Sequence, residues 1–89
     1  MVFEWDEDKR LSNIEKHKLD FVLVQLLFDG RSIHTTLSGY PHEERWLTTG
    51  IIDELYYTVI WTKRGPAIRF ISARRARDAE ERAHRQIYG

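Results

Sequence analysis

The chain has 89 residues, no cysteine and equal numbers of acidic and basic side chains. This length supports one hydrophobic core, so we predict a single domain over residues 1–89. An apolar fraction of 42% argues against disorder, and the lack of cysteine argues against a disulfide scaffold and favours the cytoplasm. The N-terminus lacks the pattern of a signal peptide, and the longest apolar stretch, residues 21–28, is too short to cross a bilayer.

The charges are unevenly distributed along the chain. Residues 1–62 carry six Lys or Arg and eleven Asp or Glu, whereas residues 63–89 carry eight and three. A basic C-terminal segment suits the binding of a polyanion such as RNA. Two alternatives stay open: a self-complementary fold, or a last helix whose charges pair four residues apart, as Arg77–Glu81, Asp78–Arg82 and Glu81–Arg85 could.

The first third of the chain predicts one strand and two helices. Residues 2–5 form a short strand, and Asp6 can cap a helix over residues 7–17. Acidic residues follow this cap and basic residues end the helix, as the helix dipole favours: Glu7, Asp8, Lys16, His17 and Lys18. A second helix is expected over residues 21–28 after Asp20. It is apolar nearly all round, so we expect it to be buried or covered by a partner.

From residue 31 the sequence changes to short segments rich in β-branched and aromatic residues, separated by turn residues. We predict four strands over residues 32–38, 44–51, 56–63 and 67–73, and a helix over about residues 75–88. In the last strand, Ile68, Phe70 and Ser72 are expected on one face and Arg69 and Ile71 on the other. The order β-α-α-β-β-β-β-α predicts an α+β fold, with an antiparallel meander sheet packed by helices.

Several kinds of chemistry find no support in the sequence. It contains no glycine-rich phosphate loop, no nucleophile elbow and no cluster of metal ligands, so we predict neither a cofactor nor a metal. The four histidines lie in four different segments. The trio His42-Glu43-Glu44 is best interpreted as an exposed turn, because neighbouring residues of a strand point to opposite faces.

Basic side chains are the remaining candidates. Arg69 stands in an apolar strand, where it must pair with an anion or reach a cleft, and an ion pair with Glu4 or Glu44 is the structural alternative. Arg74 and Arg75 stand where the last strand turns into the last helix and could bind phosphate together with backbone N–H groups. Further basic residues lie elsewhere in the chain: Lys9, Lys16 and His17 on the first helix, where Asn13 shares their face, and Arg45 at the start of a strand.

Such groups suit RNA cleavage without a metal. The ribose 2′-hydroxyl must lose a proton, the charge on the phosphorane must be stabilised, and the 5′-oxygen must gain a proton. A histidine can transfer protons near neutral pH, and arginines can stabilise the charge.

Two motifs add a family resemblance. The start FEWDEDKRLSNIEKHKLDF contains WDxxKxxxNxxKH, and the segment IRFISARRA contains RxISAR; Phe28-Asp29, Glu44-Arg45, Gly50 and Glu81-Arg82 lie between or after them. In this combination, over nearly the whole chain, the sequence resembles the BrnT-type toxins of bacterial type II toxin–antitoxin systems. The resemblance implies a ribonuclease toxin with a RelE-like fold, neutralised by a BrnA-like antitoxin with a ribbon-helix-helix segment. It also implies that the protein meets operator DNA only through the antitoxin complex, in which a toxin homodimer within a heterotetramer is expected.

The resemblance also selects site residues. It implies candidates for the RNA site at matched motif positions: Lys9, His17, Arg45, Arg69, Arg74 and Arg75. Our hypothesis for their roles is that His17, Arg69 and Arg74 are catalytic, with His17 transferring protons and the two arginines stabilising the phosphorane. Lys9, Lys16, Arg45 and Arg75 are then expected to bind the RNA. Trp5, Asp6 and Asn13 have an equally good structural interpretation as a core residue, a helix cap and a side chain bonded to the backbone. His34 and His84 lie outside the matched motifs and are expected at the surface. Two alternatives are an inactive toxin-like co-repressor and a basic helix that pairs with an acidic partner protein.

Overall fold

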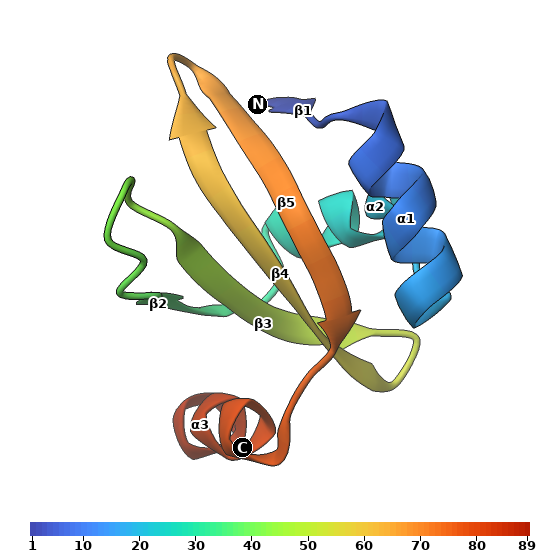
Figure 1. The fold of residues 1–89 in the computed structure, drawn as a ribbon. Helices are drawn as coiled ribbons and strands as arrows, with labels where there is room; N and C mark the ends of the chain where they lie inside the picture. The colour runs from blue at the N-terminus through green and yellow to red at the C-terminus, as the bar shows by residue number, and fades with distance from the viewer.

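The computed structural model describes all residues, 1–89, and its centre is one five-stranded sheet (Figure 1). Along the chain the elements are β1 (Val2–Glu4), α1 (Glu7–His17), α2 (Phe21–Val24), the 3-10 helix η1 (Gln25–Phe28), β2 (His34–Leu37), β3 (Trp46–Ile52), β4 (Leu55–Arg64), β5 (Ala67–Arg75) and α3 (Asp78–Tyr88). The predicted α+β class and the helix over residues 7–17 are confirmed. None of the helices is long and apolar enough to span a membrane.

The sheet has the strand order β1-β5-β4-β3-β2. Strands β2 to β5 pair antiparallel with their sequence neighbours, as predicted. β1 instead lies parallel to the start of β5, with Val2 opposite Ala67, so the prediction of a purely antiparallel meander is wrong. A parallel pair needs a long connection, and here nearly the whole domain provides it.

The core lies between one face of the sheet and the segment α1–α2–η1. Buried side chains from α2 and η1, which include Phe21, Val24 and Leu27, contact Val59 and Phe70 of the sheet. The predicted second helix is split into α2 and η1, and its outer side chains Val22 and Leu26 are 54% and 41% exposed. The helical segment is therefore covered on one side only.

The other face of the sheet, which we call the outer face, is partly covered by α3. Thr58 alternates with the buried core residue Val59 and therefore points to the outer face, where its hydroxyl donates to Glu80 of α3 at 3.0 Å. α3 starts at Asp78 and not near residue 75, because β5 continues to Arg75 and the N–H of Ala76 still donates to the strand β4.

A bulge in β5 changes which side chains share a face. The pairing between β4 and β5 shifts at Ile60/Trp61, so that Phe70 and Ala73 both reach the core although three positions separate them. The prediction that Phe70 and Ser72 share a face is therefore wrong. Alternation from the two core residues places Arg69 and Ser72, and also Arg74, on the outer face.

α3 is attached by polar contacts that the sequence did not indicate. His84 is only 3% exposed, and its Nε2 lies 3.0 Å from the carbonyl oxygen of Ser32, so the prediction of a surface histidine is wrong. The hydroxyl of Tyr88 donates to the carbonyl of Ile33. Of the three ion pairs predicted along this helix, the pair between Glu81 and Arg85 is formed, at 3.4 Å.

Candidate active site between α1 and β5

The site begins with an interaction that attaches α1 to β5. β1 ends at Glu4, so the second half of β5 has no strand on that side. Asn13 of α1 takes the place of the missing strand: its Oδ1 accepts from the N–H of Ala73 at 3.0 Å and its Nδ2 donates to the Ala73 carbonyl at 2.9 Å. The same Nδ2 donates to the carbonyl of Leu19 at 2.9 Å. The structural interpretation of Asn13 as a backbone-bonding side chain is confirmed.

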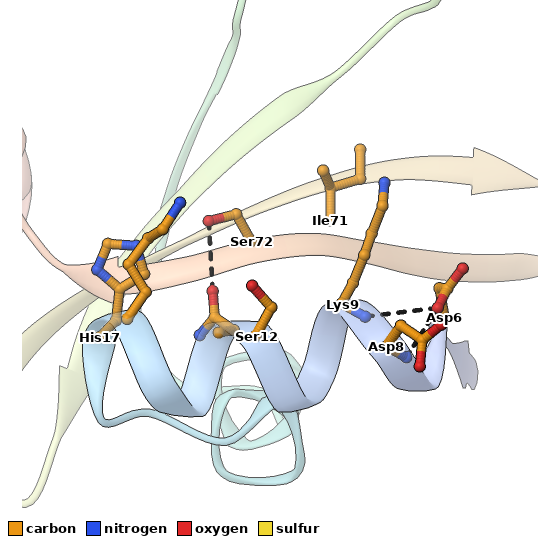
Figure 2. A pocket seen from close by; sticks show the side chains of 9 residues that line it. Asp6, Asp8, Lys9, Ser12, His17, Ile71 and Ser72 are labelled. Atoms are coloured by element: carbon orange, nitrogen blue, oxygen red, sulfur yellow. Dashed lines mark hydrogen bonds between the residues drawn. The ribbon is translucent and has the colours of Figure 1, made fainter.

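A cleft of about 360 Å³ runs along this junction, and we call it the α1–β5 cleft. His17 lies at one end, and Lys9 lies toward the other end with the two aspartates of the first turn (Figure 2). The residues that line it are Asp6, Asp8, Lys9, Ser12, Asn13, Lys16, His17, Ile71 and Ser72. The structure thus brings together three residues predicted for the site: Lys9, Lys16 and His17.

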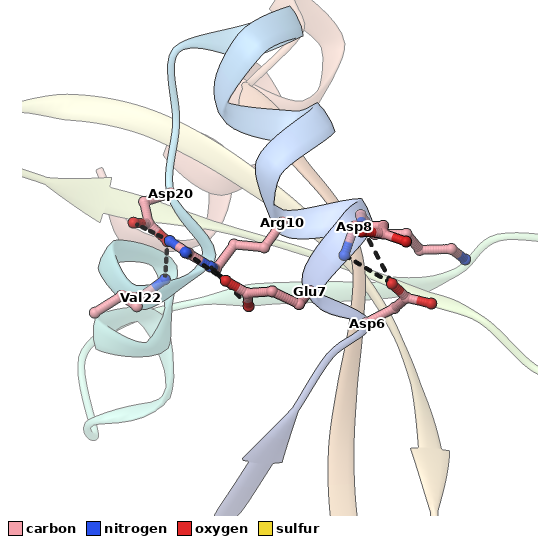
Figure 3. Close-up of polar contacts among 7 residues, drawn as sticks. Asp6, Glu7, Asp8, Arg10, Asp20 and Val22 are labelled. Carbon is pink, nitrogen blue, oxygen red and sulfur yellow. Dashed lines mark hydrogen bonds and ion pairs between the residues drawn. The ribbon is translucent and has the colours of Figure 1, made fainter.

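A different side of α1 holds the helix on the core. Arg10 donates from Nη1 to Asp20, the cap of α2, at 2.9 Å and from Nε to Glu7 at 2.9 Å (Figure 3). The Arg10 guanidinium holds the pKa of the Glu7 carboxyl below its ordinary value. Asp6 caps α1 as predicted, since its carboxylate accepts from the N–H groups of Asp8 and Lys9. The first turns of α1 are therefore fixed by the cap at Asp6 and by the contacts of Arg10 with Glu7 and Asp20.

Arg69 lies on the outer face beside the cleft, and its charge is paired. Its Nη1 contacts Oε2 of Glu4 at 2.6 Å, and the two side chains are 25% and 38% exposed. The alternative of an ion pair with Glu4 is therefore confirmed. A partly exposed pair of this kind contributes little stability, so phosphate could replace the carboxylate at modest cost.

Arg74 is held more firmly, by two hydrogen bonds to Glu80 of 2.7 and 2.9 Å. Burial alone would raise the pKa of Glu80, but hydrogen bonds from Arg74, from the N–H of Arg77 and from Thr58 lower the pKa to about 2. The guanidinium of Arg74 is only 15% exposed. To bind a phosphate, Arg74 would have to release a carboxylate that stays charged at every physiological pH.

The other two predicted RNA-binding residues do not line the cleft. Arg75 is exposed on the opposite face from Arg74, with its guanidinium 5.7 Å from the ring centre of Tyr57. Arg45 lies next to the β2–β3 loop, where it pairs with Glu43 at 2.9 Å and stacks on Tyr40 at 3.7 Å. The seven predicted site residues therefore divide between the cleft, the outer face and two separate surfaces.

Two serines in the cleft were missed by the sequence reasoning. Ser12 lies between Lys9 and Lys16 on the helix, at a spacing that could have indicated it. Ser72 reaches the cleft because of the bulge in β5, which no local pattern indicates. Nowhere in the structure do three or more His, Cys, Asp or Glu side chains come together as a metal site.

The structure is a small α+β domain whose α1–β5 cleft holds a histidine and two lysines. The comparison with family models gives the class of the protein, a ribonuclease toxin. The model described as "Ribonuclease toxin, BrnT, of type II toxin-antitoxin system" matches residues 5–80 of the 89. The chain therefore belongs to the BrnT family, and the resemblance found in its sequence is confirmed. Membership makes the protein a toxin with an antitoxin as its partner. A comparison with curated proteins gave no match.

Proposed function

We propose that the protein is a metal-independent endoribonuclease that inhibits translation and holds the scissile phosphate of its RNA in the α1–β5 cleft. The observation that carries this proposal is the convergence of His17, Lys9 and Lys16 in one cleft of a BrnT family member. The histidine supplies proton transfer near neutral pH, and the two ammonium groups supply positive charge for the RNA backbone.

The reaction is an attack by the ribose on the neighbouring phosphate. A base removes the proton of the 2′-hydroxyl, the 2′-oxygen forms a bond to phosphorus, and the bond between phosphorus and the 5′-oxygen breaks. The leaving 5′-oxygen takes a proton, so the products are a 2′,3′-cyclic phosphate and a 5′-hydroxyl end. His17 performs one of these proton transfers, and Lys9 and Lys16 hold the charged phosphate oxygens.

The arginines keep a place in this proposal as groups that stabilise the phosphorane. Arg69 would exchange Glu4 for a phosphate oxygen, and Arg74 would exchange Glu80. Both lie on the outer face of β5, on either side of the cleft residue Ser72 in the sequence. Arg75, exposed and without a carboxylate partner, contacts the RNA backbone further along.

The partner in this proposal is a BrnA-like antitoxin with a ribbon-helix-helix segment, and both proteins are cytoplasmic. The toxin itself has a RelE-like fold in this proposal. Exposed apolar side chains of α1, α2 and η1 support a partner surface: Leu11, Val22 and Leu26 are 52%, 54% and 41% exposed. Operator DNA is reached through the antitoxin, in a heterotetramer that contains a toxin homodimer.

A second candidate function is that of an inactive co-repressor. The observation that favours it is the neutralisation of Arg69 by Glu4 and of Arg74 by Glu80. If these pairs persist on RNA, neither Arg69 nor Arg74 can stabilise the phosphorane, and the chain would act with its antitoxin at the operator alone.

Cleavage of RNA by the purified chain, with and without EDTA, tests the proposal. We expect EDTA-resistant cleavage, which His17→Ala lowers by about 10²- to 10⁴-fold. His34→Ala is the matched control, since His34 lies in β2 and outside the cleft. Wild-type rates in His17→Ala would refute the histidine assignment, and loss of cleavage in EDTA would refute metal independence. A folded but inactive wild type that represses with its antitoxin would establish the co-repressor.

A further inference from the structure

We propose that the β2–β3 loop is a nucleobase-binding subsite for RNA, separate from the α1–β5 cleft; this inference rests on the proposed function. The loop, residues 38–45, lines an open pocket of about 270 Å³. Specific ligand pockets for drug-sized molecules span about 300–1,000 Å³, so this pocket suits one planar base better than a dinucleotide. The side chains that matter are Tyr40, His42, Glu43, Glu44 and Arg45.

A cluster of rings and one cation forms the centre of the loop. The guanidinium of Arg45 lies 3.7 Å from the ring centre of Tyr40, close enough to stack on it. The ring of His42 meets Tyr40 edge-on, with centres 5.4 Å apart. Tyr40 remains 40% exposed, so part of its ring is open to solvent. The cluster therefore offers flat apolar surface to the solvent beside a positive charge.

The orientation of Arg45 leaves its donors free for a ligand. Glu43 accepts from Nε at 2.9 Å, and the ring of Tyr40 supports the plane of the guanidinium. The two terminal Nη groups make no hydrogen bond within the chain. A guanidinium held in this way presents a fixed pair of donors to a phosphate oxygen or to the acceptors of a guanine edge.

The loop is closed at its base, so the cluster is arranged before a ligand arrives. The N–H of Ser38 donates to the carbonyl of Arg45 at 2.7 Å, and the N–H of Tyr40 donates to the Ser38 hydroxyl at 3.2 Å. Gly39 between them has φ +79°, a left-handed conformation that a residue with a Cβ adopts at a cost. Little conformational entropy would be lost when a base binds.

The combination of groups points to an RNA base. Bases stack on aromatic rings and on guanidinium planes, and single-stranded RNA is recognised in this way. The carboxylates of Glu43 and Glu44 line the same pocket and can accept from an exocyclic amino group, as carboxylates do from cytosine. An apolar peptide segment would use neither the free Nη groups nor these carboxylates.

The loop also lies within reach of Arg69 along one RNA strand. Trp46 stacks on the core residue Trp61, so its neighbour Arg45 points to the outer face. Arg69 lies on that face as well, in β5, which is two strands from β3. Two strand spacings are about 10 Å, a span that about three stacked nucleotides cover. A base bound in the loop would therefore lie a few nucleotides along the strand from a phosphate that Arg69 holds.

The test is a double-mutant cycle between the protein and the RNA. The probe is a single-stranded oligoribonucleotide that carries 2′-O-methyl groups throughout, so that it binds without reacting, and in which each position is made abasic in turn. With the whole chain we expect one abasic position to weaken binding about 5- to 100-fold. Tyr40→Ala should weaken binding of the intact probe by a similar factor. The probe that is abasic at the sensitive position should bind to Tyr40→Ala and to wild type with the same affinity. Tyr40→Phe should retain the affinity.

A matched control and distinct outcomes make the proposal falsifiable. Leu55→Ala removes a side chain that is also 40% exposed, at the start of β4 opposite the last residue of β3, and should leave the affinity unchanged. An unchanged RNA affinity in Tyr40→Ala overturns the subsite. The subsite is also overturned if the effect of Tyr40→Ala on the binding free energy simply adds to the effect of the abasic change at every position. Weaker antitoxin binding without an RNA effect overturns it in favour of a protein-binding loop. If wild type binds the probe but leaves the unmodified RNA intact, the proposed function fails and the subsite stands.

Discussion

Asn13 offers the sharpest test of how the cleft is built. The side chain is 6% exposed and makes three hydrogen bonds of 2.9 to 3.0 Å, two to Ala73 and one to Leu19. Asn13→Ala leaves one N–H and two carbonyl groups without these partners. Each such group costs about 1–3 kcal/mol when it stays dry, and water entering from the cleft offsets part of this cost. We expect a net loss of about 3 kcal/mol, a large share of the roughly 4–13 kcal/mol typical for 89 residues.

The assay is urea and thermal unfolding followed by tryptophan fluorescence. For a domain of this size, 3 kcal/mol corresponds to a fall in Tm of about 12–24 °C. Ser12→Ala, on the same face of α1 but exposed, is the control and should change Tm by little. A fall in the free energy of unfolding of less than about 1 kcal/mol in Asn13→Ala would refute the reasoning. It would mean that the hydrogen bonds of the Asn13 amide do not stabilise this edge as those of a neighbouring strand would.

Asn13→Asp sharpens the same test through its pH dependence. The new carboxylate keeps an acceptor for the N–H of Ala73, but it faces the carbonyls of Leu19 and Ala73 where the amide donated. Those carbonyls favour the protonated form, so the pKa of the new group rises on folding. The deficit relative to wild type should therefore be larger at pH 7 than at pH 4, where protonation restores a donor. A deficit independent of pH would contradict this.

Two further predictions concern α3 and β3. The pKa of Glu80, about 2 in the folded chain against an ordinary value of 4.5, means that its ion pair stabilises the fold above pH 4.5 and that this stability is lost as the pH falls toward 2. Glu80→Gln should lower the free energy of unfolding by about 2 kcal/mol at pH 7, after discounting for partial exposure. Its stability should also vary less with pH in acid, whereas the exposed control Glu54→Gln should keep the wild-type profile. Identical acid unfolding profiles for Glu80→Gln and wild type would contradict the ion pair. Gly50→Ala would bring a Cβ to 2.7 Å from Leu27 Cδ2 and 3.1 Å from Ile33 Cγ2. We therefore expect the free energy of unfolding to fall by about 1–3 kcal/mol, measured as a lower Tm. An unchanged Tm would show that η1 moves away freely.

Local signals account for the parts of the fold that the sequence predicts well. The bounds of α1 follow from a cap at Asp6, an acidic first turn and a basic last turn, all within twelve residues. The antiparallel hairpins follow from turn residues and β-branched segments. On α1, helical spacing alone places Lys9, Asn13 and Lys16 on one face, and the structure puts all three in the cleft.

Contacts between distant residues account for what could not be predicted. The parallel pairing of β1 with β5 and the hydrogen bonds of Asn13 to Ala73 each join residues about sixty positions apart, and no local pattern encodes them. The bulge at Ile71 is equally hidden, because it depends on how β5 meets the register of β4. The partner of Arg69 was among the alternatives the sequence offered, but the partner of Arg74 was not. The sequence pattern predicts His84 on the exposed face of the last helix, because its partner, the carbonyl of Ser32, lies 52 residues away in the chain.

The side chain that closes the β5 edge also bears on how this protein behaves at high concentration. A long strand with free N–H and C=O groups recruits other chains, and natural proteins block such edges to avoid intermolecular strand pairing. From Phe70 onward β5 would be an edge of this kind, had Asn13 and α1 not covered it. Asn13 therefore does more than shape the cleft: it covers a strand edge that could otherwise pair with a strand of another chain.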